Sequence, residues 1–157
     1  MKICVITIGK TADSNIGAAI ERYRDRIGHY IPFEYKQLPD VRKARGMSED
    51  RQKQLEGEMV MSRIAPGDRV VLLDERGKEV TSRQFAATIN DALINLPGNL
   101  VYVIGGPYGF SKAMYDRADS MLALSRMTFP HEMAQLFFIE QIYRACTILR
   151  GEPYHHD

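Results

Sequence analysis

The last eight residues of the chain, RGEPYHHD at 150–157, bring several reactive side chains together. A tyrosine and two histidines beside an arginine and a glutamate can donate protons, accept protons or stabilise an anion. Terminal segments are usually disordered unless something holds them, and the adjacent histidines also resemble a remnant of an expression tag. Composition alone therefore leaves two interpretations of this tail, a frayed end or part of a site.

A glycine-rich segment, GGPYG at 105–109, directly follows a short apolar run. Glycines allow backbone N–H groups to approach a ligand closely, and they tolerate positive φ. The segment differs from the dinucleotide-binding pattern, because it reads GGxxG and no acidic residue follows about 20 positions on at the end of a neighbouring strand. A ligand-binding loop and a tight turn without a ligand both fit these residues.

Two other loops carry polar residues. GKT at 9–11 resembles the end of a phosphate-binding loop, but Cys4 stands where such a loop requires a glycine. LSRMTFPH at 124–131 joins a short apolar run to a long helical pattern, with Pro130 in the first turn. Its exposed backbone groups can clasp a flat ring, and an ordinary connecting loop is the alternative.

The chain has the size and composition of one soluble domain. With 157 residues, 45% of them apolar and 26% charged, it can bury one core without disulfides or a metal. It shows no signal-peptide pattern and no run of about 18 apolar residues, so we expect a cytoplasmic protein without a membrane segment. Cys4 and Cys146 lack metal-ligand spacing, which predicts two small core residues and no metal site.

The net charge argues against one mode of nucleic-acid binding. The formal charge is only +1, so bulk positive charge is not expected to hold the protein on nucleic acid. Two local segments are basic, RYRDR at 22–26 and VRKARG at 41–46. Each can either meet phosphates or simply face the solvent.

Hydrophobic periodicity predicts strands and helices that alternate along the chain. Strands are expected at 2–9, 33–38, 69–74, 99–104 and 120–124, and helices at 15–27, 48–64, 82–95, 112–117 and 132–150. The third strand is expected to end in a charged turn that contains Gly77. This alternation predicts an α/β fold with a parallel sheet covered by helices. Ligands bind beyond the carboxyl ends of such strands, where the loops described above begin.

The last predicted helix is apolar over most of its circumference. Such a helix must be buried on most sides, and in a domain of this size a partner subunit is the simplest second neighbour. Glu140 and Arg144 stand one turn apart and can form an ion pair. In a dimer, polar contacts across the interface are expected from Gln135, Glu140, Gln141 and Arg144.

The chain closely resembles the RlmH family of SPOUT-class ribosomal RNA methyltransferases in four segments, KICVITIGK, LLDERGKEVTS, VIGGPYGFS and LSRMTFPHEMAQLFFIEQIYRACTILRGEPYH. The resemblance spans essentially the whole chain, 1–157, as a single domain. It implies a Rossmann-like α/β domain with a parallel sheet and a C-terminal trefoil knot, which composition cannot predict because knots are nearly absent among folds. It also implies a cytoplasmic homodimer that needs neither a metal nor a membrane.

The same resemblance implies a substrate, a cofactor and a set of cofactor-binding residues. The activity is transfer of a methyl group from S-adenosylmethionine to N3 of a pseudouridine in 23S ribosomal RNA of the assembled ribosome. The cofactor would lie among three loops, at Leu73, Gly105, Gly106, Leu124, Ser125, Arg126, Met127, Thr128 and Phe129. The family's closing GxPYH pattern falls on 151–155.

Methyl transfer to an imide nitrogen requires a bound donor, an aligned nucleophile and loss of the proton on nitrogen. A base near neutral pH, or a cation that stabilises the anion, would assist. His155 and Tyr154 are the predicted catalytic pair because they close the GxPYH pattern, and Tyr154 can stack on a splayed base. His131 is a second candidate base, or else a structural histidine. Arg144, Arg150 and His131 are the expected contacts to the RNA.

Two other functions remain open for this sequence. An α/β module that binds a cofactor without transferring a group is one, although it would not need Tyr154 and His155. Another SPOUT enzyme that acts on transfer RNA is the second. The modest net charge further predicts that free RNA binds poorly and that the shape of the ribosome supplies recognition.

Overall fold

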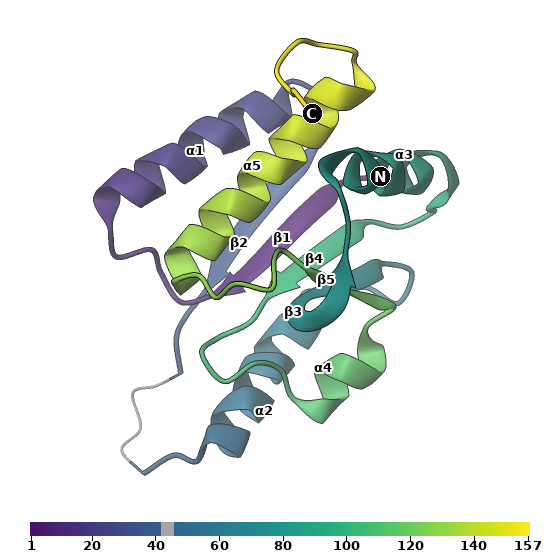
Figure 1. The fold of residues 1–157 in the computed structure, drawn as a ribbon. Coiled ribbons are helices and arrows are strands. Elements are labelled where there is room, and N and C mark those ends of the chain that lie inside the picture. Colours follow the sequence, from purple (N-terminus) through teal and green to yellow (C-terminus); the bar gives the residue numbers. More distant parts are fainter. Residues whose placement is uncertain (42–45) are drawn as a thin grey trace.

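The computed structural model describes residues 1–41 and 46–157 (Figure 1). Its strands are β1 (Ile3–Ile8), β2 (Phe33–Leu38), β3 (Arg69–Glu79), β4 (Leu100–Ile104) and β5 (Ser120–Ala123). Its helices are α1 (Ser14–Gly28), α2 (Glu49–Met61), α3 (Ser82–Asn95), α4 (Lys112–Arg117) and α5 (His131–Leu149). Most of the basic segment VRKARG lies outside the described residues.

The five strands form one parallel sheet in the order β2-β1-β4-β3-β5. Val5 of β1 pairs with Tyr35 of β2 on one side and with Tyr102 of β4 on the other. Two interior strands, β1 and β4, are buried along their whole length, as continuous apolar runs in a parallel sheet should be. The predicted parallel α/β fold is therefore confirmed.

Helices cover both faces of this sheet (Figure 1). On one face α1, α3 and α5 build a core that includes Ile20, Phe85 and Phe138. On the other face α2 and α4 build a smaller core around Val60 and Met114. The helix starts follow local signals, since Ser48, Thr81 and Ser111 each accept a backbone N–H bond that caps a first turn.

Both cysteines are free and buried, which confirms their predicted place in the core. Cys4 lies on β1 and Cys146 on α5, with exposed fractions of 4% and 5%. Burial raises the pKa of each thiol to about 11. Neither side chain is therefore a reactive thiolate near neutral pH.

The wide apolar arc of α5 is largely buried by the chain itself. The helix lies between α1 and α3 over the sheet (Figure 1). Its Phe138 packs its ring against Phe85 and Tyr102. Gln135 is fully buried; it donates to the Thr7 hydroxyl at 2.8 Å and accepts from the Tyr35 hydroxyl at 2.6 Å. The expectation that Gln135 contacts a partner subunit is wrong, because this fully buried side chain bonds to Thr7 of β1 and Tyr35 of β2.

The third strand is longer than its sequence predicts. The charged segment expected as a turn continues β3 to Glu79, and its second half pairs with β5 after an irregularity, so Leu73 and Lys78 both lie opposite Leu122. This path brings Gly77 against β5, where a Cβ atom would lie 2.6 Å from the backbone N and C of Leu122. Polar residues suggested a turn here because much of this segment faces the solvent.

Candidate active site

The loops after β4 and β5, together with the middle of β3, border two adjoining cavities. The larger, of about 540 Å³, lies between the Gly105–Phe110 loop, the middle of β3 and α4. The smaller, of about 200 Å³, lies between the segment before α5 and the middle of β3. Both cavities share the walls formed by Leu73, Asp74, Glu75 and Ile104. All nine predicted cofactor-binding residues border one or both cavities.

The glycine-rich loop needs its glycines for more than one reason. Positive φ occurs at Gly109, with φ of 80°, and its N–H donates to the carbonyl oxygen of Gly106 at 3.2 Å. Gly105 and Gly106 instead permit close packing behind the loop. A Cβ at Gly105 would lie 3.0 Å from the Phe110 ring, and one at Gly106 would lie 2.8 Å from a carboxylate oxygen of the buried Glu56. The glycines are thus required by the turn and by its packing on Phe110 and Glu56, and the ligand-binding interpretation stays a prediction.

A polar cluster that the sequence did not single out faces the glycine-rich loop across the larger cavity. Asp74 accepts a hydrogen bond from the Tyr115 hydroxyl at 2.5 Å and one from the Arg76 backbone N–H at 2.9 Å. The Arg76 guanidinium lies over the Tyr115 ring, 4.7 Å from its centroid. Burial opposes ionisation of Asp74, but hydrogen bonds from Tyr115 and Arg76 outweigh it and hold its pKa below the usual value. Asp74 therefore places an ionised carboxylate in the cavity wall, next to the Arg76 guanidinium.

Replacing Tyr115 with phenylalanine is expected to lower the free energy of unfolding by about 1 kcal/mol at pH 7, because Asp74 loses a charge-assisted hydrogen bond. A folded-state pKa below the unfolded value of about 3.9 stabilises the protein above that pH, and the effect is lost as pH falls through the folded pKa. Urea unfolding of both proteins from pH 7 down to about 3.5 should show the difference shrinking below pH 4. Tyr108→Phe, at an exposed tyrosine of the same cavity, is the control; a pH-independent difference would contradict the prediction.

The C-terminal tail is folded against α5 and is not frayed. Gly151, with φ of 69°, reverses the chain, and the N–H of Glu152 donates to the carbonyl oxygen of Thr147 at 3.0 Å. The Tyr154 ring then packs edge-on against Tyr143 at 4.8 Å. Tyr30, in the turn that follows α1, donates its hydroxyl proton to the Glu152 carboxylate at 2.6 Å. Composition left open whether the tail is frayed or folded, and these contacts show that it is ordered.

The ordered tail brings polar groups together on one side of α5. Glu140 accepts from the Tyr154 hydroxyl at 3.0 Å and pairs with the Arg144 guanidinium at 2.6 Å. The same guanidinium donates to Nδ1 of His155 at 3.2 Å and lies 4.9 Å from the centre of the Tyr154 ring. Burial, together with hydrogen bonds to Tyr23 and Glu140, raises the pKa of Tyr154. Tyr154, His155 and Arg144 are thus in one cluster.

The other two predicted RNA contacts lie at the two ends of α5, which its 19 residues place roughly 27 Å apart. His131 begins the helix, and its Nε2 lies 2.9 Å from the carbonyl oxygen of Ile8. Since a carbonyl only accepts, Nε2 carries the proton, which favours the structural role foreseen for this histidine. Arg150 follows the helix, with its guanidinium 5.6 Å from the centre of the Tyr30 ring. Only Arg144 of the three meets the tail cluster.

A third cavity, of about 270 Å³, adjoins the cofactor loops. It shares Phe129, Leu122 and Leu124 with the two cavities already described. Its lining includes Glu140, which accepts a hydrogen bond from Tyr154 and pairs with Arg144. The tail cluster therefore lies next to this cavity through Glu140, without lining it.

Comparison with known proteins gives the class of this chain. The chain belongs to the SPOUT methyltransferase family, because the family model described as "Predicted SPOUT methyltransferase" matches residues 1–155. It is 51% identical to Ribosomal RNA large subunit methyltransferase H of Parabacteroides distasonis over 157 residues, 100% of both chains. It is 49% identical to the protein of that name from Christiangramia forsetii over 156 residues, 99% of each. These relatives confirm the resemblance to the RlmH family.

A solved structure supports the fold. A probable methyltransferase from Bordetella pertussis Tohama I superposes with a TM-score of 0.56 at 13% identity, covering 92% of this chain and 93% of its own. Among the described residues, no helix is long and apolar enough to cross a membrane. In the same part of the chain, no three His, Cys, Asp or Glu side chains lie close enough together to hold a metal ion.

Proposed function

We propose that this chain methylates N3 of a pseudouridine in 23S ribosomal RNA of the assembled ribosome, in the cytoplasm, with S-adenosylmethionine as the donor. Full-length identity to relatives named as large-subunit ribosomal RNA methyltransferases supports the reaction and its RNA. The observation that carries the proposal is the position of the cavities, because all nine predicted cofactor-binding residues border them and Glu140 of the neighbouring cavity contacts the tail's Tyr154 and Arg144.

The residues around the two loop cavities fit S-adenosylmethionine. Their volumes, about 540 and about 200 Å³, are together within the range of small-molecule sites. Leu73, Ile104 and Leu122 offer apolar surface for a flat ring, and the segment 124–128 offers backbone hydrogen-bonding groups. The ionised Asp74 suits a ligand with positive charge. The donor, when bound, supplies a methyl group on a positively charged sulfonium.

The tail cluster supplies the groups that act on the nucleophile. Arg144 can stabilise the anion that forms at N3, and Tyr154 can stack on the splayed base. His155 accepts a hydrogen bond from Arg144 at Nδ1 in the free protein. When the RNA base displaces the guanidinium, that lone pair becomes available to take the N3 proton.

Incubation with methyl-labelled S-adenosylmethionine tests the proposal. The acceptors are ribosomes from a strain that lacks the enzyme, free ribosomal RNA and transfer RNA. We expect label in the 23S RNA of ribosomes and little in free RNA, because the charge of +1 gives weak binding without the ribosome's shape. Label in transfer RNA alone would favour the second SPOUT activity, and no label in any RNA would favour a cofactor-binding module.

Replacing Gly105 with valine is expected to raise the dissociation constant for S-adenosylmethionine about tenfold, since overpacking of this kind costs about 1–3 kcal/mol. The new side chain meets the Phe110 ring at 3.0 Å, so the loop must shift toward the cavity. Calorimetric titration measures the affinity, and turnover at saturating donor should be largely kept. Gly67→Val, at an exposed glycine with open space around it, is the control. Unchanged affinity in the Gly105 variant would remove this loop from the donor site.

The proposed enzyme is a homodimer with a trefoil knot, as the family resemblance implies. Phe137 and Leu149 of α5 are each 39% exposed, which leaves apolar surface for a second copy. Gln141 and Arg144 already have partners in the chain, Ser82 and Glu140. Sedimentation equilibrium tests the dimer, and a monomer at micromolar concentration would count against it.

A further inference from the structure

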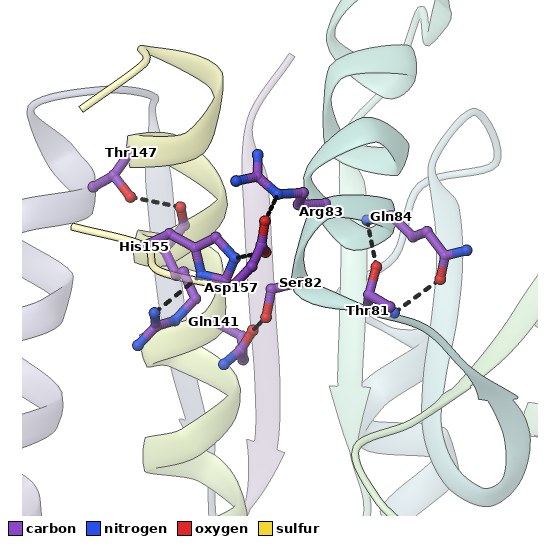
Figure 2. Close-up of polar contacts among 9 residues, drawn as sticks. Thr81, Ser82, Arg83, Gln84, Gln141, Thr147, His155 and Asp157 are labelled. Atoms are coloured by element: carbon purple, nitrogen blue, oxygen red, sulfur yellow. Dashed lines mark hydrogen bonds and ion pairs between the residues drawn. The ribbon is translucent and has the colours of Figure 1, made fainter. Parts of the chain in front are cut away.

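The last residue of the chain links the tail to a different helix. The Asp157 carboxylate lies 2.8 Å from Nε2 of His155 through one oxygen and 2.7 Å from Nε of Arg83 through the other (Figure 2). Arg83 stands in the first turn of α3, which the Thr81 and Gln84 capping box begins. The carboxylate therefore bridges the tail of α5 and the start of α3.

These contacts determine where the proton of His155 lies. Guanidinium nitrogens only donate, so Nδ1, 3.2 Å from Arg144, is the acceptor. Nε2 must then carry the proton and donate it to Asp157. The imidazole is thus held from both sides, by Arg144 of α5 and by the carboxylate that α3 anchors.

We propose that Asp157 and Arg83 are positioning residues for His155, and that together they hold its imidazole as the Nε2–H tautomer with Nδ1 directed toward Arg144 before RNA binds. This rests on the proposed catalytic role of His155. A carboxylate that orients the second nitrogen of a histidine fixes its tautomer and ring direction, and so decides which nitrogen is available as a base. Here that nitrogen is Nδ1.

Two observations separate this arrangement from an ordinary surface ion pair. Exposed pairs contribute little alone, and Asp157 and Arg83 are 66% and 59% exposed. However, one carboxylate makes both contacts, and the backbone before it is held by Glu152 and Tyr154. The ion pair with Arg83 and the contact with His155 also lower the pKa of Asp157, so it stays ionised at neutral pH.

The first test needs no RNA. A nitrogen-15 correlation spectrum of the native protein should show His155 protonated at Nε2. Asp157→Ala and Arg83→Ala should each make the Nε2 proton exchange with water about fivefold faster, the scale of a lost exposed contact. High salt should do the same to the native protein, because it screens the pair. Asp116→Ala is the matched control, because Asp116 is 63% exposed and pairs with Lys112 on α4.

The second test uses methyl transfer to ribosomes. Asp157→Ala and Arg83→Ala should each lower kcat about fivefold, because an exposed ion pair contributes at most a factor of about this size. The dissociation constant of the donor should not change. Asp157→Asn should recover part of the loss, because its amide oxygen still accepts from Nε2. The double variant should be no worse than Asp157→Ala alone, since both act through one chain of contacts.

The two readouts separate failure of this proposal from failure of the proposed function. Protonation at Nδ1, unchanged proton exchange in Arg83→Ala, or full kcat in both single variants would overturn the positioning role. If the native protein shows the expected tautomer and exchange rates but transfers no methyl group, the proposed reaction is overturned. The positioning of His155 by Asp157 and Arg83 would then still be supported.

Discussion

Replacing Gly77 with alanine is expected to lower the free energy of unfolding by about 3 kcal/mol or more, at the upper end of overpacking costs. The added Cβ would lie 2.6 Å from two backbone atoms of Leu122. Backbone atoms of a paired strand cannot move aside as a flexible side chain can, so the second half of β3 must separate from β5. Urea unfolding monitored by circular dichroism measures the change.

A second glycine variant makes this result specific. Gly28 ends α1, and a Cβ there would meet nothing within 4 Å. Gly28→Ala should therefore leave stability unchanged or raise it by up to about 1 kcal/mol, because alanine favours the helix. Similar stabilities for the two variants would show that β3 does not need to pass so close to β5. Loss of stability at Gly77 should also weaken donor binding, since Leu73 and Asp74 belong to the same strand.

Replacing His155 with alanine is expected to lower kcat for methyl transfer about 100-fold, the lower range for loss of a general base. The donor dissociation constant should stay within about twofold, because His155 borders none of the loop cavities described. Single-turnover transfer to ribosomes and calorimetric titration of the donor measure the two quantities separately.

His156→Ala is the matched control, because this neighbouring histidine is exposed and lies outside the GxPYH pattern. It should transfer methyl groups at nearly the native rate. Lost donor affinity in the His155 variant, with turnover kept, would assign His155 to cofactor binding. Equal losses in both histidine variants would instead indicate that the tail acts only by its fold.

Local features of this protein could be predicted well from sequence. The apolar runs gave the positions of β1 and β4, because strands in the middle of a parallel sheet are buried on both faces. Helix α4 begins where its Ser111 cap predicts, since a cap depends only on neighbouring backbone groups. Two of the three candidate cofactor segments were predicted from their residues and the third, at Leu73, from the family resemblance, and all three border the cavities described.

Features that depend on distant residues could not be predicted in this way. The burial of Gln135 depends on Thr7 and Tyr35, which lie more than 90 positions away in the chain. The charge in the cavity wall depends on Tyr115 of α4 reaching Asp74 of β3. Neither pairing has a periodic pattern in the sequence, because each joins a helix to a strand that lies much earlier in the chain.

The sequence by itself determined the elements, the α/β class, the candidate loops and, through the GEPYH pattern, the importance of the tail. Only the tertiary structure decided that this tail is ordered and that Arg144, Asp157 and Arg83 surround His155. The physical reason is that hydrophobic periodicity and capping act within a few residues along the chain. Hydrogen bonds between the tail, α5 and α3 depend instead on how the sheet brings separate helices side by side.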